Sequence, residues 1–309
     1  MMREKIVSLC MALVLCLGLL PVTALAAGNA PNSLYVGDQL VISSNNITYW
    51  TTDASGTLTK SNENDTWNVK YDPMSATLTL RGASIQGGSN TVSAPYGSGI
   101  YALSRSGQPV SLTIELIGTN TITGNYGIYV DAQQGETAGT NASLLIRNSS
   151  DNGMLEVSGS FYGIYVKSGT GDASLNINDA SVVAKTTQTY SGYAGVYVQS
   201  SAYATSSPQL SLAVNGGSLT TSASEGNDGI QFHVGAYGVT SETTSLSVTN
   251  NAIVDARNGG ISASRISVTL PTPTPTGNNS SGIVLTAAPA PCTAMWNCRK
   301  TLKLRAAKP

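Results

Sequence analysis

The residues able to act as acids, bases or metal ligands are few in this 309-residue chain and lie far apart in the sequence. Glycoside hydrolysis requires two carboxylates roughly 5–9 Å apart, and lyase chemistry requires a base beside a metal ion or an acidic cluster. The acidic residues instead stand singly in different repeats, and the only histidine, His233, has no acidic neighbour in the sequence. The sequence therefore predicts no catalytic residues, no metal ligands and no cofactor. The acidic residues that were considered for these roles, and that lie singly in different repeats, are Asp151, Asp179, Asp228 and Asp255.

A set of regularly spaced tyrosines is the strongest candidate for a binding surface. Each is the third residue of a four-residue motif that recurs at intervals of 28 to 36 residues. Flat rings in a row would suit the apolar faces of sugars in a polymer, but stacked rings can also simply stabilise neighbouring strands by ~0.5–1.5 kcal/mol per pair. Both interpretations stay open from the sequence. The four tyrosines are Tyr101, Tyr129, Tyr165 and Tyr197.

Two motifs repeat in register along the body of the chain and indicate which elements carry these tyrosines. A third short apolar segment follows several copies of the second motif. Three short strands per repeat predict an all-β fold, a single-stranded parallel β-helix of about six coils that we expect to be right-handed. The motif Gly-Ile-Tyr-Val is found at residues 99–102, 127–130, 163–166 and 195–198, and in weaker form at 229–232 and 260–263. The motif Ser-Leu-x-Ile/Val is found at 111–114, 143–146, 174–177, 211–214 and 245–248.

The alternation within each strand predicts which side chains face the interior. In Gly-Ile-Tyr-Val the Ile and Val side chains share one face and the Tyr side chain points to the other. The aliphatic pair must fill the coil, so we expect it to stack on its counterparts at about 4.8 Å per rung. The tyrosines are then expected to form an exposed ladder along one outer sheet. The glycine before the Ile is expected to leave room for a tight turn or for the neighbouring ring.

The same alignment places opposite charges on adjacent rungs. Asp131 and Lys167 both follow the Val of the first motif, and Glu115 and Arg147 both follow the last residue of the second. We expect these pairs to be exposed and to contribute a few tenths of a kcal/mol each. The opposite charges at equivalent positions support the predicted register of the strands.

The N-terminal residues predict export. Arg3 and Lys5 precede an apolar run over residues 6–20, and Ala24-Leu25-Ala26 supplies a small-x-small cleavage site. This layout is typical of a secretory signal peptide over residues 1–26. The body of the chain between residues 28 and 270 contains no cysteine, so it cannot be a disulfide scaffold. We therefore expect a secreted, extracellular protein, with cell-wall association as an open alternative.

Two further regions flank the repeats of residues 96–270. Residues 32–95 contain short strand patterns, including a predicted hairpin across Asp72-Pro73, and are interpreted as an N-terminal β cap. Residues 271–309 begin with a Pro-Thr linker and end in a basic tail that we expect to be disordered. A degenerate cell-wall sorting tail is the alternative. Membrane anchoring is not expected, because the apolar run is shorter than ~20 residues and is interrupted by proline.

The charge distribution argues against nucleic acid as a partner. Between residues 28 and 270 the chain has sixteen acidic and nine basic residues, which gives a net charge of −7. The five basic residues beyond Leu270 belong to the tail. A negatively charged body repels polyanions.

Several segments together resemble a group of secreted repeat proteins of anaerobic Gram-positive bacteria, commonly labelled as carbohydrate-binding-domain or β-helix surface proteins. The resemblance covers most of residues 33–270 and rests on Leu34-Tyr35-Val36-Gly37, Val69-Lys70-Tyr71-Asp72, Ala76-Thr77-Leu78-Thr79-Leu80, the Gly-Ile-Tyr-Val coils and residues 118–123. It implies a parallel β-helix and an extracellular surface role. Pectin-binding members of the broader set hold calcium through acidic turns, whereas the acidic residues here are scattered singly.

The residues and the resemblance together give three alternatives for function. The first is a secreted or cell-surface, non-catalytic protein that binds carbohydrate, a polysaccharide or a host or cell-wall glycan, or acts in adhesion. The second is a purely structural spacer. The third, a polysaccharide lyase or hydrolase, is disfavoured because the carboxylates are scattered.

Overall fold

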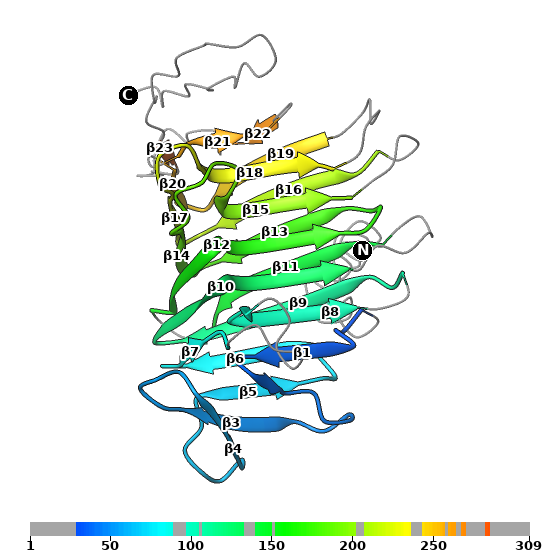
Figure 1. Ribbon diagram of the computed structural model, residues 1–309, viewed down its shortest axis with the longest axis vertical. Coiled ribbons are helices and arrows are strands. Elements are labelled where there is room, and N and C mark those ends of the chain that lie inside the picture. The colour runs from blue at the N-terminus through cyan, green and yellow to red at the C-terminus, as the bar shows by residue number, and fades with distance from the viewer. Residues whose placement is uncertain are drawn as a thin grey trace, which may run out of the picture.

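A computed structural model describes residues 29–88, 97–104, 107–132, 140–149, 152–201, 207–235, 243–256, 259–263, 267–269 and 282–284. The predicted signal peptide, Asp151, and most of the predicted linker and tail lie outside these residues. In the described part the chain is all-β, with 64% of residues in strands and no helix. The strands stack from β3 and β4 at one end to β21, β22 and β23 at the other (Figure 1).

Two sheets make up the solenoid. The first contains β1 (Ser33–Val36), β2 (Gln39–Leu40), β7 (Ser84–Gln86), β8 (Ile100–Ser104), β10 (Thr119–Ala132), β12 (Met154–Ser168), β14 (Ser181–Thr186), β15 (Ala194–Ser200), β17 (Ser218–Ser222), β18 (Asp228–Val234), β20 (Ile253–Asp255), β21 (Ile261–Ser262) and β23 (Gly282–Val284). The second contains β3 (Thr48–Thr52), β4 (Leu58–Ser61), β5 (Val69–Asp72), β6 (Thr77–Arg81), β9 (Val110–Ile117), β11 (Ala142–Asn148), β13 (Ala173–Asn178), β16 (Gln209–Asn215), β19 (Thr243–Thr249) and β22 (Ser267–Thr269).

Parallel pairing between successive coils confirms the predicted β-helix. The Gly-Ile-Tyr-Val strands pair in register from β8 through β10, β12 and β15 to β18. The Ser-Leu-x-Ile/Val strands pair in register from β9 through β11, β13 and β16 to β19. The structure has about 4 turns where the sequence predicted about six coils. The difference is consistent with the C-terminal end, where β21 has only two residues and β22 only three.

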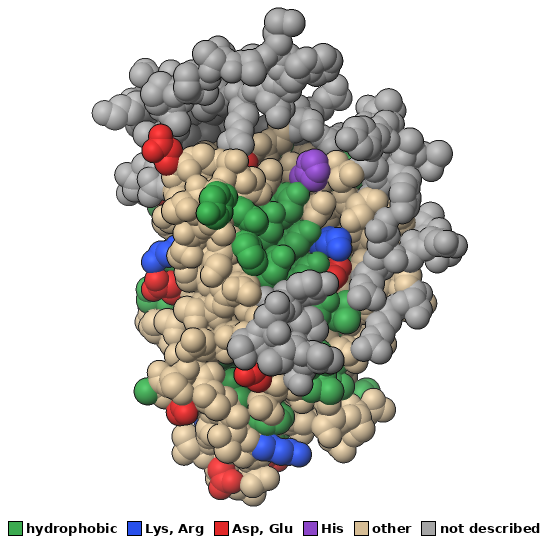
Figure 2. Space-filling view, in the orientation of Figure 1, with side chains coloured by type: hydrophobic (Ala, Val, Ile, Leu, Met, Phe, Trp, Pro, Cys, Tyr) green, Lys and Arg blue, Asp and Glu red, His purple; other side chains and the backbone are tan. Residues whose placement is uncertain are grey.

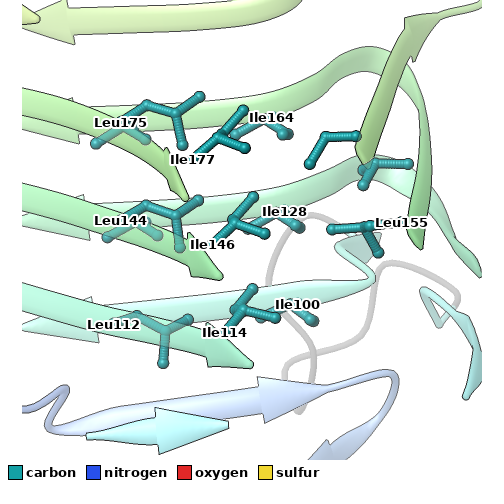
Figure 3. Packing of buried hydrophobic residues seen from close by; sticks show 14 of the residues in the cluster. Ile100, Leu112, Ile114, Ile128, Leu144, Ile146, Leu155, Ile164, Leu175 and Ile177 are labelled. Atoms are coloured by element: carbon teal, nitrogen blue, oxygen red, sulfur yellow. The ribbon is translucent and has the colours of Figure 1, made fainter. Parts of the chain in front are cut away.

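Aliphatic side chains fill the interior as the alternation predicted. Ile128, Ile164 and Val196 lie on successive rungs and are fully buried. Leu144 and Leu175 form an equivalent pair on the facing sheet (Figure 3). Burying side chains of this size contributes about 1.5–3 kcal/mol each. One continuous core therefore runs through the solenoid and includes residues of the N-terminal strands.

The glycine of the first motif is required by close approach of backbone. A Cβ atom added to Gly163 would lie 2.6 Å from the carbonyl oxygen of Gly195 and 2.8 Å from the backbone nitrogen of Lys185. A Cβ atom on Gly127 would lie 2.2 Å from Val157 Cγ1. The space is thus needed for neighbouring coils and for the third strand of the same sheet, and the adjacent tyrosine ring is not the cause.

Antiparallel strands close the N-terminal end. β1 runs antiparallel to β8, and β3, β5 and β6 form an antiparallel series whose last member pairs in parallel with β9. The predicted hairpin is present, since Val69–Asp72 pairs with Thr77–Arg81. Leu34, Val69 and Leu78 from these strands are fully buried and join the solenoid core. Both sheets therefore continue into this end instead of stopping at an open apolar rung.

One short strand comes from the segment that was predicted to be a tail. Gly282–Val284 pairs in parallel with β20, with Ile283 opposite Val254. This strand extends the third column of the solenoid by one rung, and no repeat motif in the sequence predicts it. Nothing in the described part of the chain is a helix long and apolar enough to cross a membrane.

Candidate functional site: a tyrosine face and a polar groove

The four predicted tyrosines form one continuous column on the outer side of the first sheet. Tyr101, Tyr129, Tyr165 and Tyr197 are direct register partners on successive rungs. The ring centroids are 5.0, 4.6 and 4.9 Å apart along this series. Tyr35 of β1 adds a ring at the N-terminal end, 6.4 Å from Tyr101. The register deduced from the repeats is therefore correct for every member of the column.

The prediction that this ladder is exposed is wrong. The four tyrosines retain only 2, 5, 8 and 7% of their surface in contact with solvent, in chain order. Stacking is one physical reason, because rings on adjacent rungs lie 4.6 to 5.0 Å apart between centroids and cover part of each other's faces. The planes of Tyr129 and Tyr165 differ by only 2°. The column forms a second apolar cluster outside the solenoid core.

A second column of rings, missed in the sequence, covers the first from the side. Tyr126 and Tyr162 are register partners. Each packs on the first-column tyrosine of its own coil and on that of the following coil. The centroid of Tyr126 lies 5.0 Å from that of Tyr129, and the centroid of Tyr162 lies 4.8 Å from that of Tyr197. An irregularity in the pairing at Gly124 and Tyr126 places these rings beside the column. Aromatic residues directly before the motif glycine were the available signal.

Further rings extend this cluster outward. The ring centroid of Phe161 lies 5.2 Å from that of Tyr193 and 5.7 Å from that of Tyr126. Phe161, Tyr193 and the second column are half-buried, so part of each ring remains accessible. Figure 2 shows hydrophobic side chains gathered into one area in the upper half of the face it presents. We call these rings, from Tyr35 to Tyr197, the tyrosine face. Its members are Tyr35, Tyr101, Tyr126, Tyr129, Phe161, Tyr162, Tyr165, Tyr193 and Tyr197.

A buried carboxylate holds the tips of two rings. The hydroxyl groups of Tyr129 and Tyr101 donate to Asp131 Oδ2 at 3.0 and 3.4 Å. Lys167 Nζ lies 3.6 Å from Asp131 Oδ1, on the adjacent rung as predicted. The prediction that this pair is exposed is wrong on the acidic side, because Asp131 is only 4% exposed. The two hydroxyls fold over a carboxylate that lies two residues further along β10, on the same face as Tyr129.

Burial shifts the pKa of this carboxyl group and of the hydroxyls around it. It raises the pKa of the Asp131 carboxyl above its ordinary value of 3.8, although Lys167 and the tyrosine hydroxyls act in the opposite direction. Burial also raises the pKa of the Tyr129 and Tyr165 hydroxyls above their ordinary value of 10, so both remain hydrogen-bond donors. The Tyr165 hydroxyl donates to Gln199 Oε1, which follows Tyr197 by two residues. These hydroxyls are thus occupied within the protein.

A groove whose described lining residues are all uncharged is formed by the segments that directly precede the second aromatic column in the chain. It has a volume of about 310 Å³ and lies where the third strand of one coil turns into the first strand of the next. Its polar side chains come from corresponding segments of successive coils, and the groove was not predicted from the sequence. The short Gly/Ser/Thr/Asn segments before the motif glycine were the available signal. The lining consists of Gln86, Gly87, Gly88, Gly97, Thr123, Gly124, Asn125, Ser158, Gly159, Ser160 and Thr187.

The scattered acidic residues remain scattered in the fold. Asp228 is buried opposite Ala194, whereas Asp255 lies opposite Thr220 in a different column. Asp179 occupies a tight turn with a φ of 53°. Within the described ranges, His, Cys, Asp and Glu do not form any group of three or more that could hold a metal ion. His233 is exposed, as its parity predicted, and stacks on Tyr197 at 6.3 Å.

Comparison with known proteins adds no function to this geometry. The chain matches no family model, no curated protein and no solved structure at a significant level. The resemblance to secreted surface proteins therefore remains an expectation drawn from the sequence.

Proposed function

We propose that this protein is an extracellular, non-catalytic β-solenoid that binds carbohydrate through the polar groove and the accessible part of the tyrosine face. The predicted signal peptide supports export. The outer surface supports a role in recognition, because large apolar side chains on an exposed face commonly mark interaction sites.

One observation carries the proposal: uncharged hydrogen-bonding residues of the groove directly precede the accessible aromatic residues in the chain. Tyr126 directly follows Asn125, and Phe161 directly follows Ser160, so each aromatic residue borders a polar residue of the groove. A sugar presents both an apolar C–H face and a ring of hydroxyl groups. Binding sites of this kind combine aromatic surface with a small number of oriented polar groups.

The first tyrosine column supports the binding surface and does not contact the ligand. Tyr101, Tyr129 and Tyr165 are almost fully buried and their hydroxyls are held within the protein. They act as a rigid base that fixes the second column. Ligand contact is assigned to the more accessible rings, Tyr126, Phe161 and Tyr162.

The test is a glycan array probed with the full chain and with a variant of the second column. We expect at least one class of glycan to be retained by the wild type and lost in Tyr162→Ser. The matched control is Tyr190→Ser, because Tyr190 is 75% exposed and belongs to no ring contact among those described. Failure of the wild type to retain any glycan would contradict the proposal.

A structural spacer is the second candidate, and the buried column favours it. If the rings serve only to join neighbouring rungs, Tyr162→Ser will lower the melting temperature without any glycan being retained by the wild type. Retention of a glycan by the wild type, lost in a folded Tyr162→Ser variant, would exclude this candidate.

A further inference from the structure

The groove runs along the solenoid axis and crosses several rungs. Thr123 pairs with Gln86 on one side and with Ser158 on the other, and Gly159 pairs with Thr186, which directly precedes Thr187. The described lining therefore comes from four successive coils: Gln86, Thr123 and Ser158 share one register position, and the fourth coil contributes Thr187. At about 4.8 Å per rung, three steps span about 14 Å. Such a length exceeds one monosaccharide and suits a chain that lies parallel to the axis.

The polar side chains of the groove are available to a ligand. Thr123, Asn125, Ser158 and Ser160 form no side-chain hydrogen bond with any residue of the described part. The backbone beneath them is already paired, since the Gly87 nitrogen donates to the Thr123 carbonyl at 2.6 Å and the Thr187 nitrogen donates to the Gly159 carbonyl at 2.9 Å. Hydroxyl and amide side chains, which both donate and accept, are thus the groups offered to a ligand.

None of the described residues that line the groove is charged. The nearest basic group along β14, Lys185, is paired with Glu156 of the neighbouring rung. An acidic group, Asp38, lies at the N-terminal end, where a Cβ atom on Gly88 would fall 1.3 Å from Asp38 Oδ1. An acidic group at one end and a net charge of −7 on the body both disfavour an anionic ligand.

We infer that the groove binds a neutral polysaccharide, with the chain parallel to the solenoid axis and sugar rings against Tyr126 and Phe161. This inference rests on the proposed function and narrows it to one ligand class and one location. Uronic-acid and sulfated polymers are disfavoured, because such ligands are ordinarily met by Arg or Lys, and the one basic residue in register with the described lining, Lys185, is paired with Glu156.

The experiment is affinity electrophoresis of the full chain in gels that contain a neutral polysaccharide (β-1,3-glucan, xyloglucan or mannan) or an acidic one (polygalacturonate or alginate). We expect retardation by at least one neutral polymer and by neither acidic polymer. Ser160→Glu and Thr123→Glu each place a carboxylate in the groove and should weaken binding of the neutral polymer at least tenfold. Thr123 is exposed, so its variant remains informative if Ser160→Glu fails to fold.

The control is Ser149→Glu, which adds the same charge at an exposed turn after β11, at a different corner of the coil. It should bind as the wild type does. Retardation by acidic polymers alone would overturn the neutral-ligand inference and leave carbohydrate binding intact. Neutral binding that survives both groove variants would overturn the location. Absence of retardation in every gel and of retention on the glycan array would overturn the proposed function itself.

Discussion

The interior of the solenoid and the tyrosine face are built from the same strands, yet they bury their side chains by different means. In β10 and β12, Ile128 and Ile164 point inward and are enclosed on all sides by the coil. Tyr129 and Tyr165 alternate with them, point outward and are covered by neighbouring rings instead. The inward aliphatic side chains need only an apolar surrounding of matching shape. The outward tyrosines also need hydrogen-bond partners for their hydroxyl groups, because these groups are buried with the rings.

The two regions also differ in extent. The inner column continues from Ile100 through Ile230 to the partly buried Ile261. The outer column ends after Tyr197, because Gln231 and Ser262 occupy the next positions. The solenoid closes without outer tyrosines in its last coils. Interior aliphatic residues are therefore a condition of the fold, and the tyrosine face is an addition to its N-terminal two-thirds.

The largest expected effect is in the interior. Ile164→Ala removes a fully buried side chain and leaves a cavity between rungs that cannot collapse, so the free energy of unfolding should fall by about 2–5 kcal/mol. Urea denaturation followed by circular dichroism measures it. A loss of less than about 1 kcal/mol would show that the coil relaxes into the space that the Ile164 side chain vacates.

A smaller loss is expected on the tyrosine face. Tyr165→Ser breaks the stacks with Tyr129 and Tyr197, and should lower the free energy of unfolding by about 1–3 kcal/mol. Tyr190→Ser is the matched control and should change it by less than about 0.5 kcal/mol, because Tyr190 is exposed. If urea denaturation gives the same loss of unfolding free energy for both variants, the tyrosine face contributes no more to stability than an ordinary exposed surface does.

The contribution of the polar tips can be separated from that of the rings. Tyr129→Phe keeps the stack but removes the hydroxyl that donates to Asp131 at 3.0 Å. The free energy of unfolding should fall by about 1 kcal/mol. Tyr101→Phe, whose hydroxyl lies 3.4 Å from the same oxygen, should cost less. If both variants are as stable as the wild type, the hydroxyl hydrogen bonds do not contribute to stability and the outer cluster is held by ring packing alone.

The weakest expected effect is a pH dependence specific to the outer face. The pKa of Asp131 is higher in the folded protein than its ordinary value of 3.8, so the folded state binds this proton more tightly than the unfolded state does. The stability that it contributes is present below about pH 4 and is lost as the pH rises through the folded-state pKa.

The measurement compares melting temperatures of the wild type and Asp131→Asn between about pH 4 and pH 7. The wild type should lose stability relative to the variant as the pH rises, and the other acidic groups cancel in the comparison. A relative gain of the wild type over this range would mean that Lys167 outweighs the burial of the carboxylate.

The features that the sequence predicted correctly are those set by periodicity. Gly-Ile-Tyr-Val and Ser-Leu-x-Ile determined the strand columns, the inward face and the register, including the pairing of Asp131 with Lys167 and of Glu115 with Arg147, whose side chains lie 3.1 Å apart. These follow from local geometry, because a strand alternates with a period of two and a repeat stacks equivalent positions.

Only the tertiary structure decided how much of the outer surface is accessible. Alternation assigns Tyr129 to the outside, but its exposure depends on what the neighbouring coils place beside it, and Tyr126 reaches that position through an irregularity in the pairing. The burial of Asp131 and the groove beside Asn125 have the same origin. Each is formed by residues that are about 30 positions apart in the chain, and their packing is settled only when the rungs stack.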